Sequence, residues 1–240
     1  DLPRRPGPSV RRRVVEYAGE QARRHEDRLV TEEPLEIRVT SPGRPAQRAW
    51  VTMRTPGHDF ELAAGWAISE ALSSPTGITR VAYCTDSDLT LEQQFNVVTL
   101  TLAETTDLSS RHHTTATGSS ACGVCGKDSI EEILAVRRAE PWDGPRPGPD
   151  VVRLLPQALR EHQSLFERTG GVHAAALSTA DGELLVVRED VGRHNAVDKV
   201  VGARALAGDS PACSALVVSG RAGFELVQKA VAAWISSLVA

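Results

Sequence analysis

Apolar and polar residues alternate in two segments early in the chain, a pattern typical of half-buried strands. Residues 29–39 and 49–53 show this alternation on either side of a turn-forming Ser-Pro-Gly sequence at 41–43. We therefore expect two antiparallel strands. Pro34 lacks a backbone N–H, so it confines the first strand to a sheet edge or splits it.

A helix and two further strands follow in the same region. The T-P-G-H-D sequence at 55–59 opens a helix that runs to about Leu72, and its apolar residues fall roughly on one face. Residues 78–84 and 95–102 have strand patterns. These elements together predict a small α+β domain over residues 28–110.

The second half of the chain has a more regular succession of helix and strand patterns. In chain order, the pattern predicts a helix at 156–168, strands at 172–178 and 183–188, a helix at 193–206, a strand at 213–218 and a helix at 224–233. Strands alternating with helices predict a parallel core with right-handed crossovers. We expect an α/β domain over residues 151–240.

The remaining segments have the composition of loops and linkers. Residues 1–27 are rich in arginine without apolar periodicity, which predicts a disordered tail. Residues 111–127 form a small-residue loop that we expect to be mobile, and 128–150 combine a helix opened by a capping box with a Pro/Gly-rich linker. Residues 230–240 end without a cap or polar tail, so we expect the natural chain to continue past Ala240.

Charge and composition exclude several classes of protein. A formal net charge of −4 argues against a dedicated nucleic-acid binder, which carries a large basic excess. The chain has no apolar run long enough for a bilayer and no signal-peptide pattern at its start, so we expect no membrane association. Four cysteines are too few for a disulfide scaffold and fit a reducing cytoplasm.

Two cysteines spaced C-x-x-C, Cys122 and Cys125, are the clearest candidates for chemistry. A structural zinc site needs four ligands, and His112 and His113 stand at a poor spacing to complete one. Zinc deaminases combine C-x-x-C with H-x-E. The best match, at 173–175, has alanine in place of the glutamate. We therefore expect no catalytic zinc and no metal ligands.

A thiol nucleophile fits the C-x-x-C motif best. Cys125 stands just before a predicted helix start and close to Lys127, and both features lower the pKa of a thiol. A thiol–disulfide oxidoreductase would use the same features, but its motif usually follows the first strand of a βαβ unit. Cys84 and Cys213 lie in strand patterns and fit small buried hydrophobic residues.

Two glycine-containing turns, at 189–193 and 219–223, stand where a predicted strand gives way to a helix. In an open parallel sheet such turns lie where ligands bind, and the N–H groups of a helix start attract anions. Each turn adds an arginine, which suits phosphate. The hypothesis assigns these residues to ligand binding: Asp190, Gly192, Arg193, His194, Asn195, Ser219, Gly220 and Arg221. The alternative is that both turns are ordinary connections whose arginines pair with nearby carboxylates.

Four motifs together closely resemble the formate dehydrogenase accessory sulfurtransferase family, FdhD, over roughly residues 28–235. They are S-S-A-C-G-V-C-G-K at 119–127, T-G-G-V-H-A-A at 169–175, R-E-D-V-G-R-H-N-A-V-D-K at 188–199, and S-G-R at 219–221 followed by E-L-V-Q-K at 225–229. Family members continue past the point where this chain ends, with an F-x-R-type segment that has no match here.

The resemblance implies a function and a fold. Family members take sulfur from a cysteine desulfurase as a cysteine persulfide. They pass it to the molybdenum of bis(molybdopterin guanine dinucleotide) before this cofactor enters formate dehydrogenase or a related molybdoenzyme. The family fold is similar to that of cytidine deaminases, which implies a three-layer C-terminal domain, and members form homodimers.

The resemblance also assigns roles by position. Cys122 matches the persulfide-bearing cysteine and Cys125 its partner, while Gly171 and His173 join the cofactor-binding set. Two alternatives stay open: a carrier or chaperone of the molybdenum cofactor that does no chemistry, and a thiol–disulfide oxidoreductase.

Overall fold

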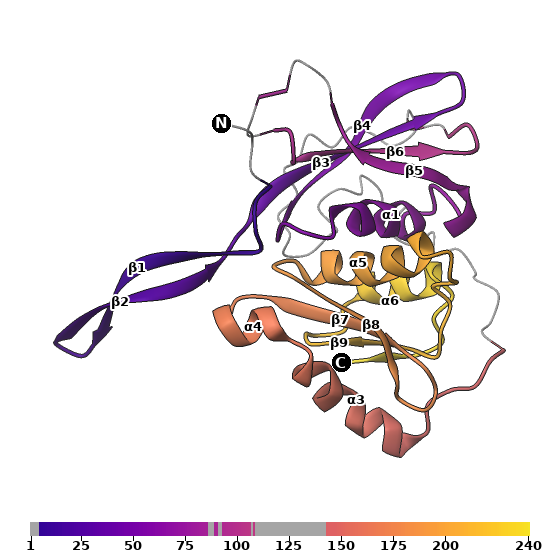
Figure 1. The fold of residues 1–240 in the computed structure, drawn as a ribbon. Coiled ribbons are helices and arrows are strands. Elements are labelled where there is room, and N and C mark those ends of the chain that lie inside the picture. The colour runs from indigo at the N-terminus through magenta and orange to yellow at the C-terminus, as the bar shows by residue number, and fades with distance from the viewer. Residues whose placement is uncertain (1–4, 86–88, 91–92, 107, 109–142) are drawn as a thin grey trace.

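A computed structural model describes residues 5–85, 89–90, 93–106, 108 and 143–240 of the chain. Two α/β halves pack against each other through helices, and a two-stranded ribbon projects from the body (Figure 1). The predicted thiol loop at 111–127, with Cys122 and Cys125, and most of the segment predicted at 128–150 lie outside the described residues.

The ribbon consists of β1 (Ser9–Ala18) and β2 (Gln21–Val30), paired antiparallel along their whole length. The expectation of a disordered tail over residues 1–27 is therefore wrong for the described part of that segment. The ribbon packs on no core along most of its length, so its sequence needs no apolar periodicity. Backbone hydrogen bonds between the strands hold it together instead, and Gly19 supplies the positive φ of 63° at the turn.

The N-terminal half has a four-stranded sheet in the order β4-β3-β6-β5, which one helix covers. Its elements are β3 (Glu33–Ser41), β4 (Arg44–Arg54), α1 (Asp59–Ser69), the short 3₁₀ helix η1 (Pro75–Gly77), β5 (Ile78–Tyr83) and β6 (Val97–Leu102). Alternate side chains of β3, Leu35, Ile37 and Val39, are buried in one core with α1. The expected antiparallel pair and helix are confirmed. The edge position expected from Pro34 is wrong, because β3 is an inner strand. Pro34 lies near the start of β3, before its pairing with β6 begins at Glu36, and the break in the pattern falls between Val30 and Glu33 instead.

The C-terminal half has a second four-stranded sheet, in the order β10-β9-β7-β8. Its elements are α3 (Pro149–Glu161), α4 (Ser164–Thr169), β7 (His173–Ser178), β8 (Leu184–Asp190), α5 (Arg193–Leu206), β9 (Ala215–Val218), α6 (Phe224–Ala232) and β10 (Leu238–Val239). The predicted parallel core is wrong for three of these strands, because β7 pairs antiparallel with both β8 and β9, whereas the short β10 pairs parallel with β9. β7 and β8 form a hairpin, and β9 joins the sheet on the other side of β7.

Helices cover both faces of this second sheet (Figure 1). Ala175 and Leu177 of β7 pack in a core with α5 and α6, whereas Ala174 and Ala176 of the same strand pack with α3. Successive residues of a strand point to opposite faces, so the buried alternation shows three layers, with α3 on one side and α5 and α6 on the other. The mixed α/β class is as expected. The likeness to cytidine deaminases stays a prediction.

The helix expected at 156–168 begins earlier and is two helices. Pro149 takes the first position of α3, where its missing N–H leaves no bond unmade, and Pro156 lies inside that helix. The chain breaks at Gln163, and α4 then runs from Ser164 to Thr169, with Gly170 capping its end at a φ of 67°. Because proline favours the first turn of a helix, the sequence places the helix start at Pro156. The helix in fact begins at Pro149, so the predicted start is too late.

Helices α1 and α5 join the two halves by crossing at glycines. A Cβ on Gly65 would lie 1.8 Å from the backbone oxygen of Asp198, and one on Gly202 would lie 1.9 Å from that of Glu61. The two backbones therefore touch at this crossing, which fixes how the halves are placed.

Candidate functional site

An open hollow of about 490 Å³ lies beside the start of β7 and the turn that follows β9. Segments far apart in the sequence line it, from the end of α3 to the turn before α6. The lining residues are Arg160, Gln163, Phe166, Gly170, Gly171, Val172, His173 and Ser219. Three predicted residues from two separate motifs, Gly171, His173 and Ser219, therefore lie at one hollow.

Two hydrogen bonds join the turn after β9 to the start of β7. The N–H of Ala174 donates to the Ser219 hydroxyl at 2.8 Å, and the N–H of Ser219 donates to the Ala174 carbonyl at 3.0 Å. Gly220 follows directly, and a Cβ there would lie 3.3 Å from Nδ1 of His173. The glycine thus lets the turn pass close to the imidazole.

His173 is half-buried at the hollow, opposite Asp190 in the strand register. Burial lowers the pKa of His173, the positive charge of Arg193 lowers it further, and the charge of Asp190 opposes both. This shift favours the neutral form of the imidazole. That form can donate one hydrogen bond and accept another.

The starts of α5 and α6 are joined by a contact between a histidine and a glutamate. His194 Nε2 lies 2.5 Å from Glu225 Oε2, and both side chains are nearly buried. Arg193 is half-buried at the first position of α5, and Arg221 is exposed on the turn before α6. The two helix starts, whose first N–H groups have no acceptor within their own helix, therefore stand side by side near the hollow.

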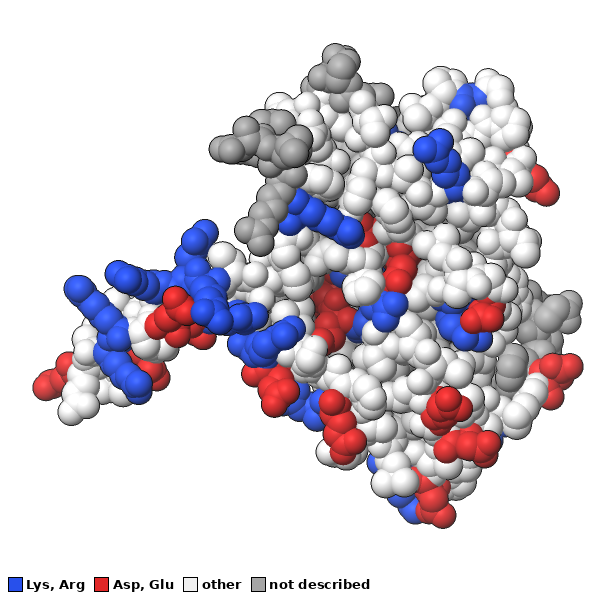
Figure 2. Space-filling view, viewed as in Figure 1, with Lys and Arg blue, Asp and Glu red and all other residues white. Residues whose placement is uncertain are grey.

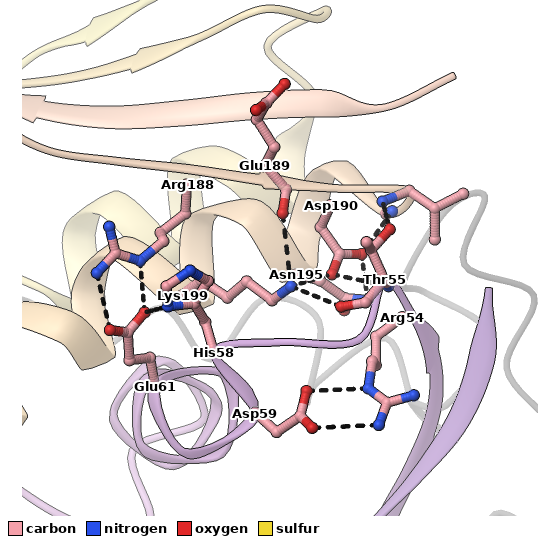
Figure 3. Close-up of polar contacts among 12 residues, drawn as sticks. Arg54, Thr55, His58, Asp59, Glu61, Arg188, Glu189, Asp190, Asn195 and Lys199 are labelled. Carbon is pink, nitrogen blue, oxygen red and sulfur yellow. Dashed lines mark hydrogen bonds and ion pairs between the residues drawn. The ribbon is translucent and has the colours of Figure 1, made fainter. Parts of the chain in front are cut away.

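A buried carboxylate at the end of β8, Asp190, links the two halves of the molecule (Figure 3). One of its oxygens lies 2.6 Å from Lys199 Nζ and accepts the N–H of Thr55 at 3.1 Å. The other accepts the N–H groups of Gly192 at 2.8 Å and of the Asn195 amide at 3.0 Å. Removal of either charge would leave the other buried and uncompensated.

Two further contacts extend this link. The Asn195 amide also donates to the Met53 carbonyl at 2.8 Å, and Lys199 donates to the Thr55 carbonyl at 2.9 Å. Asp190 and Asn195 thus have protein partners from the end of β4 and the loop after it. Contact of either side chain with a bound ligand stays a prediction.

Some residues that the sequence analysis did not predict line the hollow or support its lining. The Glu189 carboxylate accepts the N–H groups of Leu165 and Phe166, each at 2.8 Å, and so caps the start of α4. The guanidinium of Arg160 stacks over the Phe166 ring at 4.4 Å. Glu189 directly precedes the predicted site residue Asp190, so the sequence motif could have indicated it. The contact between Arg160 and Phe166 depends on the fold, and no local motif indicates it.

A second hollow of about 370 Å³ lies where the two halves meet the root of the ribbon, at Pro8. At its edge Arg188 makes two hydrogen bonds to Glu61, at 2.6 and 2.8 Å, and His58 lies 3.1 Å from the same carboxylate (Figure 3). Burial raises the pKa of Glu61, but the hydrogen bonds and charges of Arg188 and His58 outweigh it and lower the pKa to about 2.

The other two cysteines lie apart from both hollows. Cys213 is buried, and burial raises its pKa to about 11, which fits a small hydrophobic residue. Cys84 is half-buried and accepts a hydrogen bond from Arg38 at 3.6 Å. Within the described residues, no cluster of three or more His, Cys, Asp or Glu side chains is placed to hold a metal ion. In the same part of the chain, no helix has the length and apolarity to span a membrane.

Comparison with known proteins gives a consistent result. The sequence pattern of the FdhD/NarQ family matches residues 30–240. The sulfur carrier protein FdhD of Streptomyces coelicolor is 44% identical over 237 residues, covering 96% of this chain and 82% of the relative. That of Nocardia farcinica is 45% identical over 233 residues, covering 96% and 81%.

A solved structure shares the fold. A protein described as a formate dehydrogenase accessory protein, from Desulfotalea psychrophila, superposes with a TM-score of 0.70 at 20% sequence identity, covering 96% of this chain and 82% of that one. At this identity the likeness supports the fold alone.

Proposed function

Because the chain belongs to the FdhD/NarQ family, we propose that it carries sulfur for the maturation of a formate dehydrogenase or related molybdoenzyme. The sulfur comes from a cysteine desulfurase and travels as a persulfide on Cys122. The acceptor is the molybdenum of bis(molybdopterin guanine dinucleotide). The reaction takes place in the cytoplasm, and the working form is a homodimer.

The observation that supports the acceptor side of this proposal is the hollow beside β7 and β9. Gly171, His173 and Ser219 line it, and the starts of α5 and α6, with Arg193 and Arg221, adjoin it. Helix starts and arginines favour anions, and a neutral imidazole can hydrogen-bond to a base or sugar. These features suit the phosphates and guanine of a nucleotide-bearing cofactor.

The loading step is an exchange between a thiolate and a persulfide. The Cys122 thiolate attacks the outer sulfur of the donor's cysteine persulfide, a new S–S bond forms, and the donor cysteine leaves as a thiolate. Delivery of that sulfur as sulfide takes two electrons. Cys125 can supply them as a second thiol, because its attack on Cys122 releases sulfide and leaves a disulfide between the two.

A mass measurement tests the loading step. The full chain is incubated with a cysteine desulfurase and cysteine, and the peptide that contains Cys122 is expected to gain one sulfur atom that a reductant removes. Cys122→Ser should abolish the gain, whereas Cys125→Ser should keep it. Absence of an added sulfur on either cysteine in the wild type would refute the proposal.

The same hollow would also serve a carrier that holds the cofactor without doing chemistry. The double variant Cys122→Ser with Cys125→Ser separates the two functions, with activity of the matured dehydrogenase as the readout. Sulfur transfer requires that activity be lost in this variant. Maturation at the wild-type level would instead support the carrier.

A further inference from the structure

The β1–β2 ribbon extends away from the body as an arm and buries little of its own surface (Figure 1). At its root, Val30 lies against Gly171, where a Cβ would meet the valine side chain at 3.3 Å. Farther out, Val15 and Tyr17 are 44% and 74% exposed. A two-stranded ribbon is marginally stable by itself in water, so an arm of this kind gains stability from a surface that covers it.

The strand register divides the arm into two faces of different charge. Directly opposed residues share a face, and alternate residues change face. On one, the balanced face, Arg12 stands opposite Asp27 and Glu16 opposite Arg23. These opposite charges compensate each other across the strands.

The other face, the basic face, carries an excess of positive charge. It has four arginines against one glutamate: Arg11, Arg13, Arg24, Arg28 and Glu26. Arg11 stands directly opposite Arg28, and the contact of Arg11 with Glu26, at 3.3 Å, offsets only part of this charge. Like charges in opposed positions destabilise a strand pair, so this face costs stability in the free arm.

The composition of the basic face fits a protein partner. Val15 and Tyr17 share that face with the arginines, and tyrosine and arginine are among the residue types that contribute most to binding at protein interfaces. Residues 1–30 carry eight arginines and five acidic residues, a net charge of +3. Residues 31–240 carry 19 basic and 26 acidic residues, a net charge of −7. Figure 2 shows the basic side chains gathered along the arm and acidic ones spread over the body.

We propose that the arm is the element by which two copies of this chain associate, with its basic face laid against the acidic body of the second copy. Charge complementarity within one sequence favours this occupant, because each copy offers both the basic arm and the acidic body. The inference rests on the homodimer of the proposed function and deepens it by assigning its interface. Because Val30 at the root of the arm contacts Gly171, which lines the hollow, an arm bound to a second copy would also be held next to the hollow.

Two double variants with the same change in net charge test this interface. Arg11→Ser with Arg28→Ser removes the opposed arginines of the basic face, which relieves repulsion within the arm. Arg12→Ser with Arg23→Ser removes the same charge from the balanced face and breaks two compensated pairs. Sedimentation velocity of each full chain over a concentration series gives the dimer dissociation constant.

The basic-face variant is expected to dimerise about 10-fold to 100-fold more weakly than the wild type, since two interface arginines are lost. The balanced-face variant should stay close to the wild type. Dimerisation of the wild type should weaken between ~0.1 M and ~1 M salt, as the Debye length falls from about 10 to 3 Å. Tyr17→Ser, which changes no charge, should weaken the dimer as well.

Three results would overturn the inference. They are a monomeric wild type, a dimer that neither double variant weakens, and equal weakening by both. The second would leave the homodimer standing with another interface. Sulfur loading of Cys122 is measured in parallel, so failure of the sulfur-carrier proposal is seen separately. Circular dichroism of each variant checks that it folds.

Discussion

Gly220 shows how a single residue shapes the candidate site. Its backbone passes so close to His173 that a methyl group would stand 3.3 Å from Nδ1. That distance is shorter than ordinary van der Waals contact, so an alanine would press on the imidazole. Gly223, on the same turn, has open space for 4 Å around the position that a methyl group would take. The two glycines therefore form a matched pair.

Gly220→Ala is expected to weaken the binding of GDP about 10-fold, because crowding of this size costs roughly 1–3 kcal/mol. Gly223→Ala should bind GDP as the wild type does. Isothermal titration calorimetry of the three proteins gives the dissociation constants. Equal affinity in all three would show that His173 is not part of a guanine-nucleotide site.

Part of this site is predictable from the sequence and the rest is not, for a physical reason. Gly171, His173 and Ser219 stand in glycine-containing motifs near strand ends, which are local signals that a few neighbouring residues carry. Arg160 and Phe166 carry no such signal. Their place at the hollow depends on how α3 and α4 are positioned in the fold, and the Glu189 carboxylate of β8 holds the start of α4.

At the scale of elements, the crossing of α1 and α5 sets the arrangement of the halves. A glycine inside a helix normally costs stability relative to alanine, by roughly 0.5–1 kcal/mol. At Gly65 and Gly202 the effect is reversed, because a methyl group would overlap the backbone of the facing helix at 1.8 and 1.9 Å. The helices would have to separate to admit it.

Gly65→Ala and Gly202→Ala are each expected to destabilise the fold by about 3 kcal/mol or more, since overpacking against backbone cannot relax by a rotamer change. Gly148→Ala, before α3 with open space around it, should change stability by less than about 1 kcal/mol. Urea unfolding followed by circular dichroism provides the free energies. A neutral or stabilising effect at position 65 or 202 would contradict the crossing.

The elements themselves are largely predictable, but their arrangement is not. The pattern predicts the bounds of α5 and the positions of β3, β4 and β7, because hydrophobic periodicity is a local property. The side of β7 on which β9 pairs is decided by the packing of α5 and α6, which no local pattern encodes. The arm escapes prediction for the opposite reason, since its strands pack on no core and so carry no apolar alternation.

At the scale of the whole molecule, charged contacts bind the two halves around the helix crossing. Asp190 and Lys199 of the C-terminal half hold the Thr55 loop of the N-terminal half. Arg188 on β8 holds Glu61 on α1. The R-E-D-V-G-R-H-N-A segment therefore joins the halves as well as adjoining the candidate site.

The contact of Arg188 with Glu61 makes the stability of the molecule depend on pH. Its pKa is about 2 in the folded chain against an ordinary 4.5, so the carboxylate stabilises the fold fully above about pH 4.5. That stabilisation is lost as the pH falls from 4.5 toward 2, because protonation then removes the charge that Arg188 holds.

Glu61→Gln should cost about 2–3 kcal/mol at pH 7, and the cost should shrink steadily below pH 4.5. The free energy of urea unfolding at several pH values measures this difference, with the exposed Glu167→Gln as the control that should show little cost at any pH. A cost for Glu61→Gln that stays constant down to pH 3 would mean that shape, rather than charge, holds α1 to β8.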